Sequence, residues 1–93
     1  MRIIDIDKLI EIDNHIYYIK LYKGSLMLMN NMGQIIRKEI KFSIEYKPVG
    51  DPVILAEIIE TDNLKIDHIM PNIIKRIEKL DKEGVLASAT KGV

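Results

Sequence analysis

The segment from residue 34 to residue 46 constrains the fold more than any other part of the sequence. Its apolar residues recur at every second position, and polar residues fill the positions between them. The apolar set is Ile36, Ile40, Phe42, Ile44 and Tyr46, and the polar set is Arg37, Glu39, Lys41, Ser43 and Glu45. Successive side chains of a strand point to opposite faces of a sheet, so this pattern predicts a strand with one buried and one solvated face.

Three earlier segments also resemble strands, and short turn sequences separate them. Residues 3–12 alternate, with Ile4, Ile6, Ile10 and Ile12 on one parity and mostly acids on the other. The next two expected strands are residues 15–22 and 25–30. The expected turns are Asp13-Asn14, Lys23-Gly24 and Asn31-Met32-Gly33, because Asn and Gly tolerate a positive φ. We therefore expect an antiparallel meander of about four strands over residues 3–46.

The second half of the chain changes to a helical period. Apolar residues spaced by three and four form one stripe: Ile66, Ile69, Met70, Ile73, Ile74, Ile77 and Leu80. This spacing predicts a helix over about residues 67–83, which Asp67 caps and Gly84 ends. Residues 53–61 fit either a helix opened by Pro52 or a buried strand, and the helix is the preferred interpretation. The fold class is therefore α+β, with one or two helices and the last helix packed on one sheet face.

Composition narrows the class of protein. A chain of 93 residues suits a single domain spanning residues 1–93, and the tail from about residue 87 lacks bulky side chains and is expected to fray. The 14 basic and 14 acidic residues balance, so no global field draws the chain to nucleic acid or anionic lipid. The absence of cysteine, of a secretory signal and of a long apolar run predicts a cytoplasmic protein without membrane association.

Side chains that could support catalysis or metal binding are few. Asp5, Asp7, Glu11 and Asp13 share one strand parity, but an acidic solvated face explains them as well as a cation site does. His15 and His68 have no second imidazole or cysteine at ligand spacing and are expected to be ordinary surface residues. No phosphate loop or nucleophile motif occurs. We expect no metal, no cofactor and no enzymatic activity.

The expected third strand has apolar residues on both of its faces, which suggests an interface. The interface residues predicted from this pattern are Leu26, Met27, Leu28, Met29 and Met32. One helix covers only one face of a sheet, so a second apolar face needs another segment of the chain or a second chain. Methionine adapts well to partner surfaces, which favours the second chain, although a core with two apolar faces inside one chain explains the same residues.

The stretch from Ile73 to Leu86 resembles the recognition helix and wing entry of winged helix-turn-helix proteins, with Glu57-Ile58-Ile59-Glu60 belonging to the same pattern. In both, a basic amphipathic helix ends in an acid, a glycine and an aliphatic residue. The resemblance implies a helix that lies in the major groove of DNA. It assigns DNA contacts to Asn72, Lys75, Arg76 and Lys79.

The function expected from the sequence is that of a small non-enzymatic interaction or regulatory module. It acts through protein contacts, as a homodimer, with another protein, or both. The alternative is a winged-helix-like DNA-binding regulator that uses the helix over residues 67–83.

Overall fold

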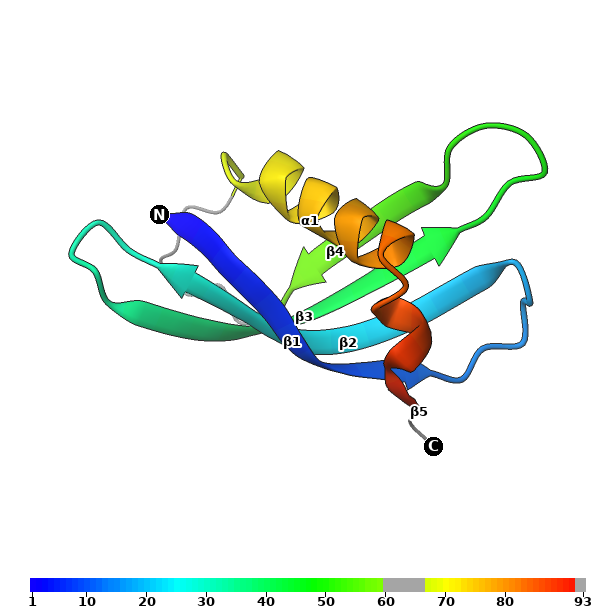
Figure 1. The fold of residues 1–93 in the computed structure, drawn as a ribbon, viewed down its shortest axis with the longest axis horizontal. Helices are drawn as coiled ribbons and strands as arrows, with labels where there is room; N and C mark the ends of the chain where they lie inside the picture. Colours follow the sequence, from blue (N-terminus) through cyan, green and yellow to red (C-terminus); the bar gives the residue numbers. More distant parts are fainter. Residues whose placement is uncertain (60–66, 92–93) are drawn as a thin grey trace.

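A computed structural model describes residues 1–59 and 67–91. Four strands form an antiparallel meander: β1 (Arg2–Ile12), β2 (Ile19–Met29), β3 (Ile35–Glu45) and β4 (Val53–Ile58). After them come the helix α1 (Met70–Lys82), the 3₁₀ turn η1 (Leu86–Ser88) and the short strand β5 (Thr90–Lys91), which pairs in parallel with β1. The sheet order is β4-β3-β2-β1-β5, and α1 packs on one face (Figure 1). The predicted α+β class, a four-strand meander followed by a packed helix, is confirmed.

β2 runs straight through Lys23-Gly24, so the predicted turn at these residues is wrong. Lys23 pairs with Lys41, and Gly24 pairs with Ile40, in an unbroken ladder between β2 and β3. The glycine has another role. A Cβ atom on Gly24 would lie 2.9 Å from the carbonyl oxygen of Asp7, so only glycine lets β1 pass this close.

A β-bulge in β1 causes this close approach. The pairing of β1 with β2 shifts between Asp7 and Ile10, where Lys8 and Leu9 together oppose Gly24. Lys8 takes a left-handed conformation with φ of 52°. The extra residue reverses the parity of the strand, because side-chain alternation restarts after it.

The bulge divides the apolar residues of β1 between the two faces of the sheet. Ile6 pairs with Leu26 and is buried in the core, whereas Ile12 pairs with Leu21 on the opposite face. Ile10 lies on that opposite face too, as the partner of Lys23. The predicted single apolar face of β1 is therefore wrong beyond Lys8.

The two hairpin loops use asparagine side chains as backbone partners. Asn14 Oδ1 accepts from the amide of Ile16 at 3.4 Å, and its Nδ2 donates to the carbonyl of Ile19 at 3.1 Å. In the second loop Asn30 Oδ1 accepts from the amides of Met32 and Gln34. The turns predicted on either side of β2 are therefore confirmed, with Gly33 at positive φ in the second.

Residues 53–58 form a strand, which corrects the preferred helical interpretation of residues 53–61. β4 pairs with β3 from Val53 opposite Glu45 to Ile58 opposite Ile40. Val53 and Leu55 are exposed, while Ile58 is buried, which is the alternation of a half-buried strand. Pro52 precedes the first residue of the strand, where a missing amide hydrogen is tolerated as well as at a helix start. Residues 60 and 61 lie outside the described part of the chain.

α1 is shorter than predicted at its start and ends as predicted. It begins at Met70 with Pro71 in the first turn, and its N-cap is Ile69, without a side-chain hydrogen bond. The predicted cap, Asp67, does not perform this role. At the end, the amide of Val85 donates to the Leu80 carbonyl at 3.0 Å, and Gly84 has φ of 76°, which together form a Schellman stop.

The segment after α1 returns to the sheet. Leu86 is 2% exposed within η1, and β5 pairs with β1 through Ile10 and Thr90. The tail predicted to fray from residue 87 is therefore structured as far as Lys91, and residues 92 and 93 lie outside the described chain.

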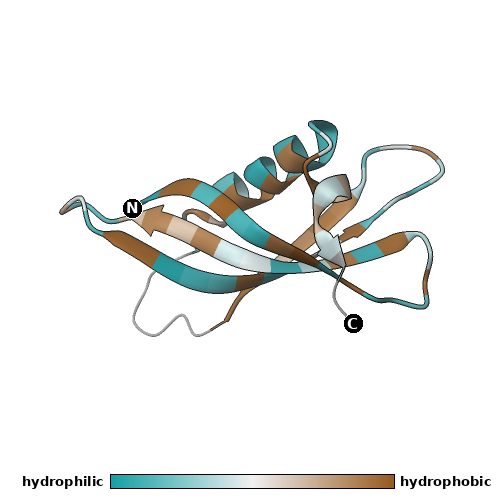
Figure 2. Ribbon diagram, turned by 60° about the horizontal axis from the view of Figure 1, so that its bottom comes forward, coloured by the Kyte–Doolittle hydropathy of each residue, from teal (hydrophilic) through white to brown (hydrophobic). Residues whose placement is uncertain are grey.

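The core lies between α1 and one face of the sheet. α1 contacts both β4 and β1, so it crosses the face that the meander curls around. Apolar and polar residues alternate along the strands and around α1 (Figure 2). The buried residues are Ile6, Tyr22, Leu26, Leu28, Ile40, Phe42, Ile44, Ile58, Ile69, Ile73, Ile77, Leu80 and Leu86.

Candidate interaction surfaces

No element among residues 1–59 and 67–91 covers the sheet face opposite α1, which we term the outer face. Residues paired across strands share a face, so the register places one residue of each meander strand side by side on it. These four residues, termed the apolar row, are Ile12, Leu21, Ser43 and Leu55. Leu55 is 67% exposed. The row lines an open depression of about 380 Å³.

Charges of opposite sign lie on the two sides of the apolar row. Lys41 and Glu45 stand two residues before and after Ser43 on β3, so both share its face. Lys41 pairs with Lys23 on β2 and with Glu57 on β4. On the other side Glu45 is paired with aliphatic residues, Ile19 and Val53. One side is thus net positive, and the other carries a carboxylate among apolar side chains.

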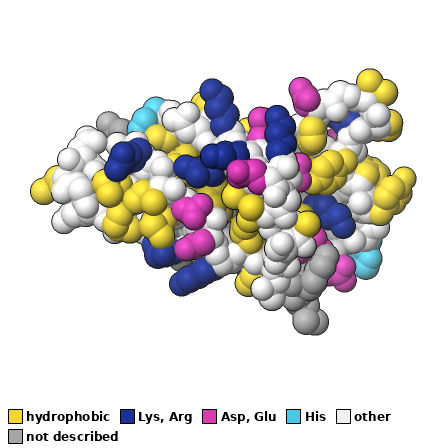
Figure 3. All heavy atoms as spheres, in the orientation of Figure 1, with side chains coloured by type: hydrophobic (Ala, Val, Ile, Leu, Met, Phe, Trp, Pro, Cys, Tyr) yellow, Lys and Arg dark blue, Asp and Glu magenta, His cyan; other side chains and the backbone are white. Residues whose placement is uncertain are grey.

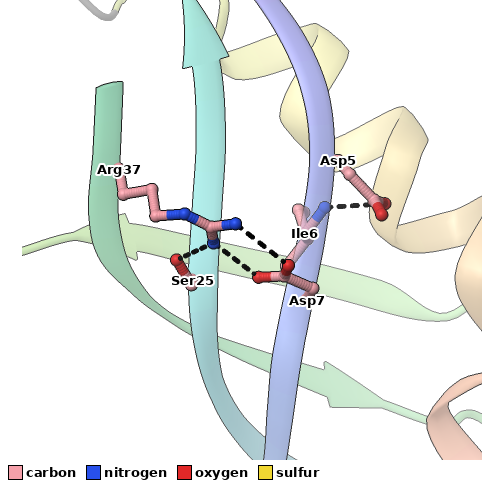
Figure 4. A network of polar contacts seen from close by, with 5 residues as sticks. All are labelled: Asp5, Ile6, Asp7, Ser25 and Arg37. Carbon is pink, nitrogen blue, oxygen red and sulfur yellow. Dashed lines mark hydrogen bonds and ion pairs between the residues drawn. The ribbon is translucent and has the colours of Figure 1, made fainter. Parts of the chain in front are cut away.

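Farther along the outer face, a polar network joins β1, β2 and β3 (Figure 4). Arg37 Nη1 donates to Asp7 Oδ1 and to Ser25 Oγ, both at 3.0 Å. The ion pair is solvated, with side-chain exposures of 43% for Arg37 and 36% for Asp7. Exposed pairs of this kind contribute about 0 to 1 kcal/mol, so the network fixes side-chain positions more than it stabilises the fold.

The predicted interface residues divide between the two faces of β2. Leu26 and Leu28 are fully buried in the core beneath α1, so they cannot meet a partner, and their assignment to an interface is corrected. Met27 and Met29 are half-buried on the outer face, and Met32 is 81% exposed in the loop after β2. The residues that expose most apolar surface on the outer face, such as Leu55, were missed because β4 was read as a helix.

The acidic residues of β1 do not form a shared metal site in the described chain. Asp5 and Asp7 point away from each other in Figure 4, and Asp5 Oδ1 accepts from the amide of Ile6 at 2.8 Å. Glu11 lies beyond the bulge opposite Tyr22, on the helix side of the sheet, so the predicted common parity of these acids is wrong. No group of three potential ligands is found among residues 1–59 and 67–91. His15 and His68 are both exposed.

A small polar cluster lies where the C-terminal half of α1 meets the sheet. Tyr46 donates its hydroxyl hydrogen to Asp81 Oδ1 at 2.8 Å. Burial and this hydrogen bond, together with the nearby carboxylate charge, raise the pKa of Tyr46. Burial also raises the pKa of Tyr22, followed in effect by the charge of Glu11. The cluster therefore helps to fix the position of α1 over the sheet.

The four residues predicted to contact DNA lie along one side of α1. Together with Arg2 of β1 they line an open groove of about 390 Å³, which we term the basic groove. Its polar lining is Arg2, Asn72, Lys75, Arg76 and Lys79. Figure 3 shows Lys and Arg side chains gathered along this face of the molecule. Arg2 was missed because nothing in the sequence indicates that the start of β1 lies beside α1.

A protein-family model matches residues 1–82, which run from the first residue through the end of α1. The chain belongs to the BB_0187 family. The matched part includes the whole meander and both sides of the basic groove. No curated protein matches the chain, and no solved structure matches it. Within residues 1–59 and 67–91, no helix has the length and apolar character needed to cross a bilayer.

Proposed function

We propose that this member of the family is a non-enzymatic interaction module that self-associates through the outer face of its sheet. The observation that carries the proposal is the apolar row, whose Leu55 is 67% exposed beside Ile12 and Leu21. Apolar surface of this kind gains free energy when it leaves water, at about 25 cal/mol per Å².

The charges beside the apolar row favour a second copy of the same chain as the partner. In a face-to-face dimer whose two-fold axis passes over Ser43 and across the strands, each β3 runs antiparallel to its copy. Lys41 of one chain then lies over Glu45 of the other, twice, because the two residues are equally far from Ser43 along β3. The apolar rows meet each other between these two charge pairs. Sheets that pack face to face keep their strands within about 30°, which is compatible with this arrangement.

The winged-helix alternative has less support from the geometry. The segment in the place of the first helix of a helix-turn-helix unit is the strand β4. After Gly84 the described chain forms η1 and a two-residue strand parallel to β1, where a winged helix forms a hairpin. The basic side of α1 is therefore considered apart from that fold.

Light scattering coupled to size exclusion tests the proposal. We expect the mass of a dimer at micromolar concentration. Leu55→Lys should give a monomer, whereas Met32→Lys, a matched change at an exposed apolar residue in the loop after β2, should remain a dimer. A monomeric mass for the parent chain across a hundredfold dilution series would contradict the proposal.

A charge exchange tests the orientation of the dimer. Lys41→Glu alone and Glu45→Lys alone each place like charges opposite each other twice, so each variant should dimerise more weakly than the parent. A mixture of the two variants should form a heterodimer, because both of its contacts are again attractive. If the mixture is as weakly associated as the separate variants, the two-fold arrangement over Ser43 is wrong.

A further inference from the structure

We propose that the basic groove binds the phosphodiester backbone of a nucleic-acid strand without reading its sequence. This activity is separate from self-association, because the groove lies on the α1 side of the sheet and the apolar row on the other. The ligand class follows from the charge, partners and shape of the groove.

The groove gathers four cationic side chains from two elements. Lys75, Arg76 and Lys79 follow one another along α1, and Arg2 faces them from β1. Among the described residues, no carboxylate lines the groove. Glu83 and Asp5 line the adjoining groove toward the end of α1, which sets the limit of the positive region. In a chain with zero net charge, this concentration of one sign is local to the groove.

None of the four cations is neutralised within the described chain. The ion pair found among residues 1–59 and 67–91 joins Arg37 to Asp7 and leaves the groove untouched. Arg2 donates to the sulfur of Met29 at 3.5 Å, and a thioether is a weak acceptor that leaves the remaining guanidinium hydrogens available. Lys75 and Lys79 are like charges one helical turn apart, an arrangement that destabilises a helix unless an anion lies between them. An anionic ligand would supply that missing partner.

The shape of the groove favours a strand of repeated phosphates over a single small anion. Asn72 and Lys79 are seven residues apart on α1, which corresponds to about 10 Å along the helix axis. A nucleic-acid strand advances by about 3.4 Å per phosphate along its axis, so the cations match about three successive phosphates. The lining formed by the described residues contains no aromatic side chain for stacking on bases, so the contacts are to the backbone and independent of sequence.

Fluorescence anisotropy with a labelled 20-nucleotide oligo-dT tests the proposal on the full chain. We expect binding whose logarithmic salt slope is roughly −2 to −3, as three or four neutralised phosphates imply, or a 20- to 50-fold loss in affinity between about 50 and 200 mM salt. Lys79→Glu and Arg2→Ala should each weaken binding at least several-fold. Lys47→Glu, an equal charge change in the loop before β4, should leave affinity nearly unchanged.

Three results would overturn the proposal. One is no binding to the oligonucleotide at low salt. Another is an equal loss for Lys79→Glu and Lys47→Glu, which would mean that net charge and not the groove controls affinity. The last is binding to phosphatidylserine vesicles without binding to the oligonucleotide, which would assign the groove to a membrane surface. Thermal melts of each variant exclude unfolding as the cause, and Arg2→Ala decides the question if Lys79→Glu does not fold.

Discussion

Replacing Ile73 by alanine should reveal how far the stability of this domain depends on α1. Ile73 is fully buried in the core between the helix and the sheet. Truncation of a buried isoleucine to alanine costs about 2 to 5 kcal/mol, through lost apolar burial and the cavity left behind. A small domain has a total stability of roughly 5 to 15 kcal/mol, so the variant should fold but be clearly weakened.

Urea unfolding followed by circular dichroism measures this change. A loss of about 3 kcal/mol should lower the midpoint of a thermal melt by roughly 12 to 24 °C in a domain of this size. The m-value should stay constant, because the same surface is exposed on unfolding. Protein concentration must be the same in all samples, since self-association would add to the apparent stability.

The control lies on the opposite side of the same helix. Lys75 is exposed, so Lys75→Ala should change the free energy of unfolding by less than about 0.5 kcal/mol. If Ile73→Ala costs no more than Lys75→Ala, then α1 does not dock on the sheet as described, and the placement of the basic groove is wrong as well.

Two further substitutions test local features of the fold. Gly24→Ala should lower the free energy of unfolding by about 1 to 3 kcal/mol in urea titrations, because the new methyl group meets the Asp7 carbonyl at 2.9 Å; a gain in stability, as alanine usually brings inside a strand, would show that the bulge can move aside. Tyr46→Phe should cost about 1 kcal/mol at neutral pH through loss of the hydrogen bond to Asp81. The raised pKa of Tyr46 means that its contribution is complete below the unfolded value near pH 10 and is lost as pH rises further, so Tyr46→Phe should lose less stability than the parent between about pH 9 and pH 11, and equal losses would exclude this linkage.

The regular parts of the fold could be predicted because their side chains repeat with the period of the element. The alternation from Ile36 to Tyr46 and the stripe from Ile69 to Leu80 each correspond to an observed element. Gly84 marked the end of α1 because a left-handed residue at that position strongly favours glycine.

The errors have one kind of cause, which is a contact between residues far apart in the sequence. Gly24 suggested a turn, although its role is to admit the bulged strand β1, and the bulge itself carries no glycine, only Lys8 at positive φ. The six residues of β4 are too few for periodicity to separate a strand from a helix, and their pairing with β3 decides. Arg2 joined the basic groove only through the tertiary packing of β1 beside α1.

β5 joins the two ends of the described chain, since Thr90 pairs with Ile10. Each antiparallel pair of the meander forms between neighbouring segments, and such local contacts close small loops at low entropic cost. The parallel pair closes a loop that contains nearly the whole domain, so it forms late in folding, after α1 has brought η1 back over β1. With only two residues in its ladder, β5 should also open first in the native state, and its amide hydrogens should exchange with solvent faster than those of β2 and β3.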